Sequence, residues 1–256
     1  MDYSRKHMAL RISYLNDVIS KIPHGKFLFS SGKKIIIINY DPEDPHITAT
    51  NRKRYLADSF RGRKYIDPVS LYLQYKSELD YLMAKWDSLY WAPPVTIPFP
   101  LVKTRSSMLT SDFFASAGIN QNTFRVENPI IHKGMILRSK NELIACQVLD
   151  RMGIEYKIEP EIIIDGFTVF TPDILFNLPE LDKCTAIELD GAMNKEAYRN
   201  KSESRMMNYF RNGFKEYKDI IFMRMYDPSE FEISTFESMI RTSVESNICD
   251  IVFPDD

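Results

Sequence analysis

The fold predicted for this chain rests on two neighbouring stretches, Thr171-Pro172-Asp173-Ile174-Leu175-Phe176 and Thr185-Ala186-Ile187-Glu188-Leu189-Asp190-Gly191. Residues 174–176 are apolar and residues 185–189 include β-branched positions, so each stretch predicts a short buried strand. Between them, residues 177–183 contain Asn, Pro and Asp, which favour a turn that folds one strand against the other. Acidic side chains then lie at the ends of adjacent strands. Buried carboxylates need a neutralising cation, and we expect a hard divalent ion with oxygen ligands, usually Mg²⁺.

Composition places the chain among ordinary globular proteins, with 256 residues, 44% hydrophobic and 27% charged. No apolar run approaches membrane-spanning length, and the first residues lead into no signal-peptide core. The three cysteines are scattered without metal-ligand spacing, and the four histidines are widely spread. We therefore expect a cytoplasmic protein with reduced cysteines, no membrane partner and no His-rich zinc site.

Charge is unevenly distributed, although the net charge is only −2. Residues 1–105 hold 17 Lys and Arg against 10 Asp and Glu, whereas residues 106–256 hold 16 against 25. A basic front portion that meets phosphate and an acidic rear portion that holds metal would explain this asymmetry. Two ordinary solvated surfaces would explain it equally well.

The front third predicts a helix to about residue 22, a hairpin over residues 26–40 and a long helix over residues 68–91. We expect the two helices to cover each other's apolar stripes. Between hairpin and long helix lies the front basic cluster, the best phosphate-binding candidate of the chain: Arg52, Lys53, Arg54, Arg61, Arg63 and Lys64. We expect domains at residues 1–100 and 131–256, with residues 101–130 as the linker.

In the rear half, residues 140–152 predict a helix that Ser139 caps and that Gly153 ends. Glu142 lies three residues after Ser139, which completes a capping-box pattern and gives Glu142 a purely structural explanation. A strand over residues 154–164 turns at residues 165–166 into residues 167–170. Beyond the two central stretches, we expect a further strand at residues 220–225 and a closing helix from residue 231 to about residue 248.

Several strings of this half, spread over roughly residues 130–225, resemble a poorly characterised bacterial and phage subgroup of the PD-(D/E)xK nuclease superfamily, which has the restriction-endonuclease-like fold. The subgroup carries an R-S-K-x-E helix, a Y-P-D-F strand and an E-H-x-G-M strand end. The corresponding strings here are Arg138-Ser139-Lys140-Asn141-Glu142, Pro172-Asp173, and Glu188-Leu189-Asp190-Gly191-Ala192-Met193. A helix with Tyr198, Lys201, Arg205 and Tyr209 follows, as in the subgroup.

The resemblance implies a metal site made of Asp173, Glu188 and Glu142. It also exposes a departure, because Asp190 stands where many such nucleases have a lysine that orients the attacking water. Asp190 would then serve as an extra ligand. The spacing of residues 198, 201, 205 and 209 places them on one helix face, so we expect Lys201, or as second choice Arg205, to supply the missing cation. Tyr198 and Tyr209 would flank it and contact nucleic acid, unless this face is only a solvated basic stripe.

We thus expect an α/β protein with a restriction-endonuclease-like central mixed sheet, flanking helices and an α/β N-terminal region. The expected activity is Mg²⁺-dependent (Mn²⁺ as an alternative) hydrolysis of DNA phosphodiesters, with RNA also open as a substrate. Two alternatives remain: a nuclease fold that binds nucleic acid without cleaving it, and a regulatory or structural protein without a nucleic-acid role. The sequence does not fix the oligomeric state, and a homodimer is one alternative.

Overall fold

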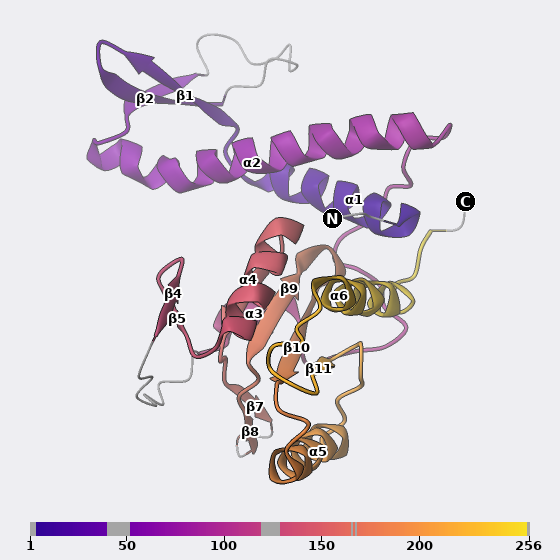
Figure 1. Cartoon of the computed structure of the whole chain (residues 1–256). Helices are drawn as coiled ribbons and strands as arrows, with labels where there is room; N and C mark the ends of the chain where they lie inside the picture. The colour runs from indigo at the N-terminus through magenta and orange to yellow at the C-terminus, as the bar shows by residue number, and fades with distance from the viewer. Residues whose placement is uncertain (1–3, 40–51, 119–128, 165, 167, 255–256) are drawn as a thin grey trace. The chain divides into compact units, whose positions relative to one another are not determined.

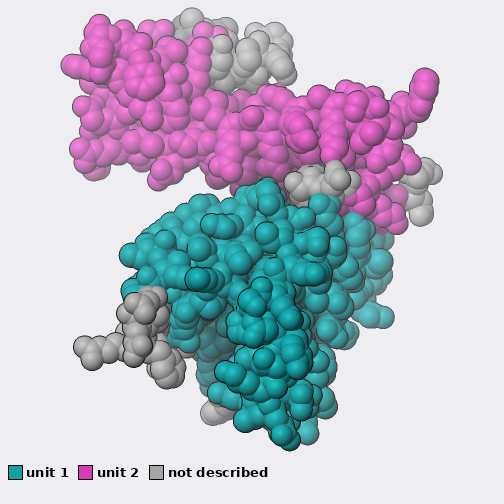
Figure 2. All heavy atoms as spheres, viewed as in Figure 1, with its two compact units in different colours: residues 1–3, 101–252 teal, residues 4–100, 253–256 magenta. Residues whose placement is uncertain are grey.

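The structure is a computed structural model that describes residues 4–39, 52–118, 129–164, 166 and 168–254. The chain divides into two compact units (Figures 1 and 2). The smaller unit contains Ser4–Pro100 and the end of the chain from Phe253, and the larger unit contains Leu101–Val252. Both units combine helices and strands, which confirms the expected α/β class.

The smaller unit begins with helix α1 (Arg5–Lys21) and contains the long helix α2 (Phe60–Leu89), and the two helices pack against each other as predicted. The apolar stripe of α1 is buried, as is the stripe of α2 that includes Leu79, Leu82 and Trp86. Burying each such side chain contributes on the order of 2 kcal/mol, so this contact holds the helical part of the unit together.

Three antiparallel strands form the sheet of this unit: β1 (Gly25–Ser30), β2 (Lys33–Ile38) and β3 (Lys53–Leu56), in that order. The predicted hairpin is confirmed, with its turn at residues 31–32. Ile36 and Ile38 of β2 pack on Ala57 and Val69, so one face of the sheet is closed by the start of α2.

Helix α2 begins eight residues earlier than the sequence pattern indicated. The oxygen Oγ of Ser59 caps it by accepting the backbone N–H of Gly62 at 3.0 Å. Pro68, the predicted start, lies inside the helix. Three members of the front basic cluster, at positions 61, 63 and 64, therefore lie on the first turns of α2 and not in a loop.

The larger unit is built on a four-stranded mixed sheet in the order β11-β10-β9-β6. Its strands are β6 (Glu155–Ile158), β9 (Ile174–Leu178), β10 (Lys183–Asp190) and β11 (Ile220–Arg224). Strand β9 is antiparallel to both β6 and β10, whereas β11 is parallel to β10. The two stretches that decided the predicted fold thus form the centre of the sheet, joined by the short 3₁₀ turn η1 (Pro179–Leu181).

Helices cover both faces of this sheet. Leu175, Ala186 and Phe222 project from one face into a core shared with Tyr209 of α5 (Glu196–Arg211). Residues at alternate positions, among them Ile187, point to the other face and are also fully buried. Helices α4 (Lys140–Met152) and α6 (Ile233–Ile248) contact each other. Helix α4 also contacts β6, and α6 also contacts β11.

Two expectations for this half need correction. The strand predicted over residues 154–164 is two strands, β6 and β7 (Ile162–Ile164), because Glu159 adopts a left-handed conformation (φ 46°) just before Pro160. Strand β7 pairs with β8 (Thr168–Phe170) in a separate hairpin; residues 165 and 167 of the predicted turn lie outside the described residues.

The expected linker over residues 101–130 is, as far as residue 118, part of the larger unit. Leu109 and Phe114 are buried in the core beside α5, and Phe114 belongs to the short helix α3 (Ser111–Ser116). Residues 119–128 lie outside the described residues. The small hairpin β4 (Ile130–His132) and β5 (Met135–Leu137) then leads into α4.

Candidate functional site

Asp173 and Glu188 face each other across two central strands. The antiparallel register pairs Ile174 with Ile187, so the next pair along the ladder is Asp173 opposite Glu188. Side chains directly opposed in this way lie on the same face of the sheet with Cβ atoms about 5 Å apart. Asp173 is fixed by its oxygen Oδ2, which accepts the backbone N–H of Leu189 at 2.6 Å.

Glu188 is 1% exposed and is held from α5. The hydroxyl of Tyr209 donates a hydrogen bond of 2.7 Å to its oxygen Oε1. The guanidinium of Arg205 lies 3.3 Å from the other oxygen, Oε2. Among the described residues, Oε2 has no hydrogen-bond partner. Apart from its ion pair with Arg205, Oε2 of this buried carboxylate is therefore open to a further cation.

Asp190 lies two residues further along β10 and points to the same face as Glu188, because side chains alternate along a strand. It is completely buried, and both of its oxygens are engaged. Ser202 donates a hydrogen bond of 2.5 Å to Oδ2, and Arg205 forms an ion pair with Oδ1. Asp190 thus orients the guanidinium of Arg205, and each of its oxygens already has a partner.

The two facing carboxyl groups hold protons more tightly than usual. Burial raises the pKa of Asp173 to about 6, with the nearby carboxylate of Glu142 acting in the same direction. Burial raises the pKa of Glu188 to about 8, and the facing Asp173 adds to this, against the opposing effects of Arg205 and Tyr209. One guanidinium does not neutralise the cluster, so the site favours either protons or another cation.

Glu142 helps to cap α4 in a variant of the predicted capping box, in which its carboxylate accepts the backbone N–H of Arg138 instead of that of Ser139. Its oxygen Oε1 accepts the hydroxyl of Ser139 at 3.0 Å, its Oε2 accepts the backbone N–H of Arg138 at 2.9 Å, and the Ser139 oxygen Oγ accepts the Glu142 N–H at 3.1 Å. The start of α4 lies near the end of β10, because a Cβ atom on Gly191 would lie 3.5 Å from Nδ2 of Asn141. Glu142 is close enough to raise the pKa of Asp173, but both of its carboxylate oxygens accept hydrogen bonds of the helix cap.

The helix α5 brings Arg205, and not Lys201, to the carboxylates. Its site-facing residues are Tyr198, Ser202, Arg205 and Tyr209, whereas Lys201 is exposed to solvent. The expected order of the two basic candidates is therefore reversed. Ser202 was missed because serine carries no charge. The site-facing residues 198, 202, 205 and 209 follow one another at intervals of four, three and four residues, and this helical spacing was the signal that could have identified Ser202.

The two tyrosines of α5 differ in what they can contact. Tyr209 is 1% exposed, and its ring stacks on Phe170 with centroids 4.4 Å apart, so it cannot stack on a nucleic-acid base. The prediction that Tyr209 contacts nucleic acid is therefore wrong, and its hydroxyl instead positions Glu188. Tyr198 is half-buried and keeps an accessible surface.

Every member of the front basic cluster is exposed, as a phosphate-binding surface requires. The aromatic neighbours Tyr55 and Tyr65 stack on each other, with centroids 5.3 Å apart, and Lys64 lies 4.9 Å from the ring centroid of Tyr65. The exposed ring of Phe60 lies beside them in the sequence. This surface belongs to the smaller unit, and the carboxylates belong to the larger one.

A metal ion at the carboxylates would find two donors rather than the three that the sequence indicated. Within the described residues, no group of three or more His, Cys, Asp or Glu side chains is gathered around one point. The residues that fit a hard divalent ion are Asp173 and Glu188, through oxygens that no cap or ion pair fully uses. Water or phosphate oxygens would have to complete its coordination, as is usual for Mg²⁺.

Comparison of the chain with protein-family models, with curated proteins and with solved structures gave no match. In the part of the chain that the structure describes, no helix combines the length and the apolarity needed to cross a bilayer.

Proposed function

We propose that this protein is a metal-dependent nuclease that hydrolyses phosphodiester bonds of nucleic acid, with DNA as the expected substrate. The observation that carries the proposal is the facing pair Asp173 and Glu188, in which the buried oxygen Oε2 of Glu188 lacks a hydrogen-bond partner among the described residues. The four-stranded mixed sheet with a helix on either face agrees with the restriction-endonuclease-like layout that the sequence resemblance implies.

The residues around the pair have separate tasks in this proposal. Asp173 and Glu188 would hold a Mg²⁺ or Mn²⁺ ion, which when bound activates water and neutralises charge on the scissile phosphate. Arg205 would place a positive charge at the developing negative charge, the task of the absent lysine. Asp190 orients Arg205, and Tyr209 orients Glu188.

Binding of the polymer would come mainly from the front basic cluster. Its six exposed cations can contact backbone phosphates without reading the base sequence. Such contacts release counterions, so affinity should fall steeply as salt rises.

The proposal is tested with the whole chain on linear, nicked and branched DNA and on RNA, with Mg²⁺, Mn²⁺ or EDTA. We expect cleavage that needs metal and that Asp173→Asn abolishes. The matched control Asp112→Asn removes an exposed carboxylate on α3 and should cleave as the parent does. Cleavage that persists in both EDTA and the Asp173→Asn variant would overturn the assigned site.

A second candidate is a nuclease fold that binds nucleic acid without cleaving it. It is favoured by Asp190 in the lysine position and by the contact of Arg205 with both Glu188 and Asp190, which already neutralises part of the cluster. This candidate predicts binding that is equal in Mg²⁺ and EDTA, with no cleavage on any substrate. The substrate panel therefore separates it from the enzyme.

A further inference from the structure

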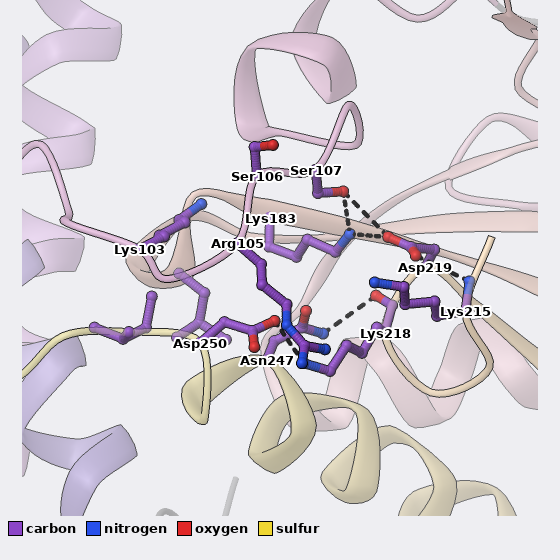
Figure 3. Close-up of a pocket in the computed structure, with 12 residues that line it drawn as sticks. Lys103, Arg105, Ser106, Ser107, Lys183, Lys215, Lys218, Asp219, Asn247 and Asp250 are labelled. Atoms are coloured by element: carbon purple, nitrogen blue, oxygen red, sulfur yellow. Dashed lines mark hydrogen bonds and ion pairs between the residues drawn. The ribbon is translucent and has the colours of Figure 1, made fainter. Parts of the chain in front are cut away.

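A second charged site lies in the larger unit, where strands β10 and β11 begin. Five basic residues line this basic pocket: Lys103, Arg105, Lys183, Lys215 and Lys218 (Figure 3). They come from the start of the unit, from the first residue of β10 and from the loop before β11, while the end of α6 closes the pocket. The fold therefore gathers cations that are far apart in the sequence.

Two of these cations form ion pairs with acidic residues. The Lys183 side chain is only 4% exposed and pairs with Asp219, and its Nζ donates a hydrogen bond of 2.6 Å to Oγ of Ser107. Nζ of Lys218 lies 2.5 Å from Oδ2 of Asp250. A buried lysine is costly unless it is paired, and the ion pair with Asp219 offsets the burial of Lys183.

The other cations leave the pocket with an excess of positive charge. Lys103 pairs with Asp182 at 3.3 Å, but Arg105 and Lys215 are exposed and have no ion-pair partner among the described residues. The five basic side chains of the pocket are thus paired with only three carboxylates, those of Asp182, Asp219 and Asp250. Figure 3 shows Arg105 and Lys215 extending into the same space as the paired lysines. This excess of two charges matches a phosphate dianion.

The basic pocket is separate from the carboxylates at the other end of β10. Lys183 begins this strand, and Glu188 comes five residues later, which is about 17 Å at the usual rise per strand residue. Because the spacing is odd, the two side chains also project to opposite faces of the sheet. A ligand in the pocket would therefore leave the facing pair Asp173 and Glu188 untouched.

The dimensions of the pocket limit its ligand. Its volume is about 40 Å³, which favours a small anion such as a single phosphate group. We propose that this pocket binds a phosphate group, with Arg105 and Lys215 as its direct contacts. Arg105 can bind two phosphate oxygens at once, and Lys215 adds a point charge. The phosphate belongs either to nucleic acid or to a small phosphorylated molecule.

The test measures binding to the whole chain by calorimetry, with inorganic phosphate as the probe, chloride as the ionic-strength reference and EDTA present. The double variant Arg105→Gln/Lys215→Gln removes both unpaired charges, and both positions are exposed, so folding should be kept. We expect its phosphate affinity to fall by about tenfold or more. The control Lys140→Gln/Arg211→Gln removes the same charge from exposed positions elsewhere in the unit and should bind phosphate as the parent does.

A second arm identifies the source of the phosphate with a short oligonucleotide, prepared with and without a 5′-phosphate. Nucleic acid is the source if the pocket variant weakens oligonucleotide binding and inorganic phosphate competes with it. A small phosphorylated molecule is the source if only phosphate binding changes. If the pocket variant and the control bind both probes equally, the basic pocket is ordinary surface. Binding without cleavage is measured throughout, so the outcome is independent of nuclease activity.

Discussion

Replacement of Glu188 by Gln should abolish most of the pH dependence of stability above about pH 5. Glutamine keeps the oxygen that accepts the hydroxyl of Tyr209 but carries no titratable proton, so the variant isolates the charge. In the parent, burial and Asp173 raise the pKa of Glu188 from 4.5 to about 8. The native state then binds this proton more tightly than the unfolded state does.

The sign and size follow from that difference. Because the native state binds more protons between the two pKa values, the free energy of unfolding falls as pH rises from 4.5 towards 8. At neutral pH the loss from this one group is about 3 kcal/mol relative to acidic pH, out of a total stability on the order of 10 kcal/mol. Asp173, with its pKa raised to about 6, adds a smaller loss of the same sign.

Urea unfolding at about pH 5, 6, 7 and 8 measures the effect in the parent and in Glu188→Gln. We expect a steeply falling free energy in the parent and a much shallower fall in the variant, which keeps the contribution of Asp173. Mg²⁺ at about ten times its Kd should restore about 1.4 kcal/mol to the parent at the alkaline end, and nothing to Glu188→Gln. Identical pH profiles for the two proteins would refute the raised pKa, and Mg²⁺ stabilisation of both would refute the assigned metal pair.

Three further predictions concern the surrounding residues. Arg205→Met should lower cleavage by about a hundredfold, whereas Lys201→Ala, which removes an exposed side chain, should stay near the parent rate; equal losses would contradict the contact geometry. Alanine at the first three positions of the front basic cluster should weaken DNA binding and flatten its dependence on salt in a filter-binding assay, and an unchanged slope would mark the cluster as ordinary surface. Glu142→Ala should cost about 1 kcal/mol in thermal unfolding through loss of the capping box, with Glu142→Gln as the milder control.

Elements with strong local signals were predictable from the sequence. The apolar period of α1, the hairpin turn of β1 and β2, and the Ser139 cap of α4 each depend on residues close in the chain. Strands β9 and β10 were predictable because their apolar runs flank a short turn. The same two strands bring Asp173 opposite Glu188, so the centre of the candidate site also followed from local pattern.

Features that depend on distant contacts were not predictable. Residues 101–118 look like a linker because their few apolar side chains have no period, yet Leu109 and Phe114 are buried by partners from the sheet and α5. The basic pocket was missed for the same reason, since its cations come from segments more than a hundred residues apart. Lys201 and Arg205 lie four residues apart, and only the rotation of α5 against the sheet decides which one faces Glu188.

The pair formed by Asp190 and Arg205 changes what the candidate site requires of a metal. A lysine at position 190 would lie on the same face of the sheet as Glu188. The ionised side chains of Asp173 and Glu188 would then have one positive neighbour. In this chain Arg205 brings the positive charge from α5, but Asp190, which holds it there, contributes a third negative charge. The ionised cluster therefore keeps an excess of two negative charges, where a lysine at position 190 would leave an excess of one.

One divalent ion balances that excess. Protons on Asp173 and Glu188 are the alternative, and the raised pKa values of these two groups show that protons are favoured there. On the proposed function, metal binding and proton release at Glu188 are thus one coupled equilibrium, and metal affinity should rise with pH up to about 8.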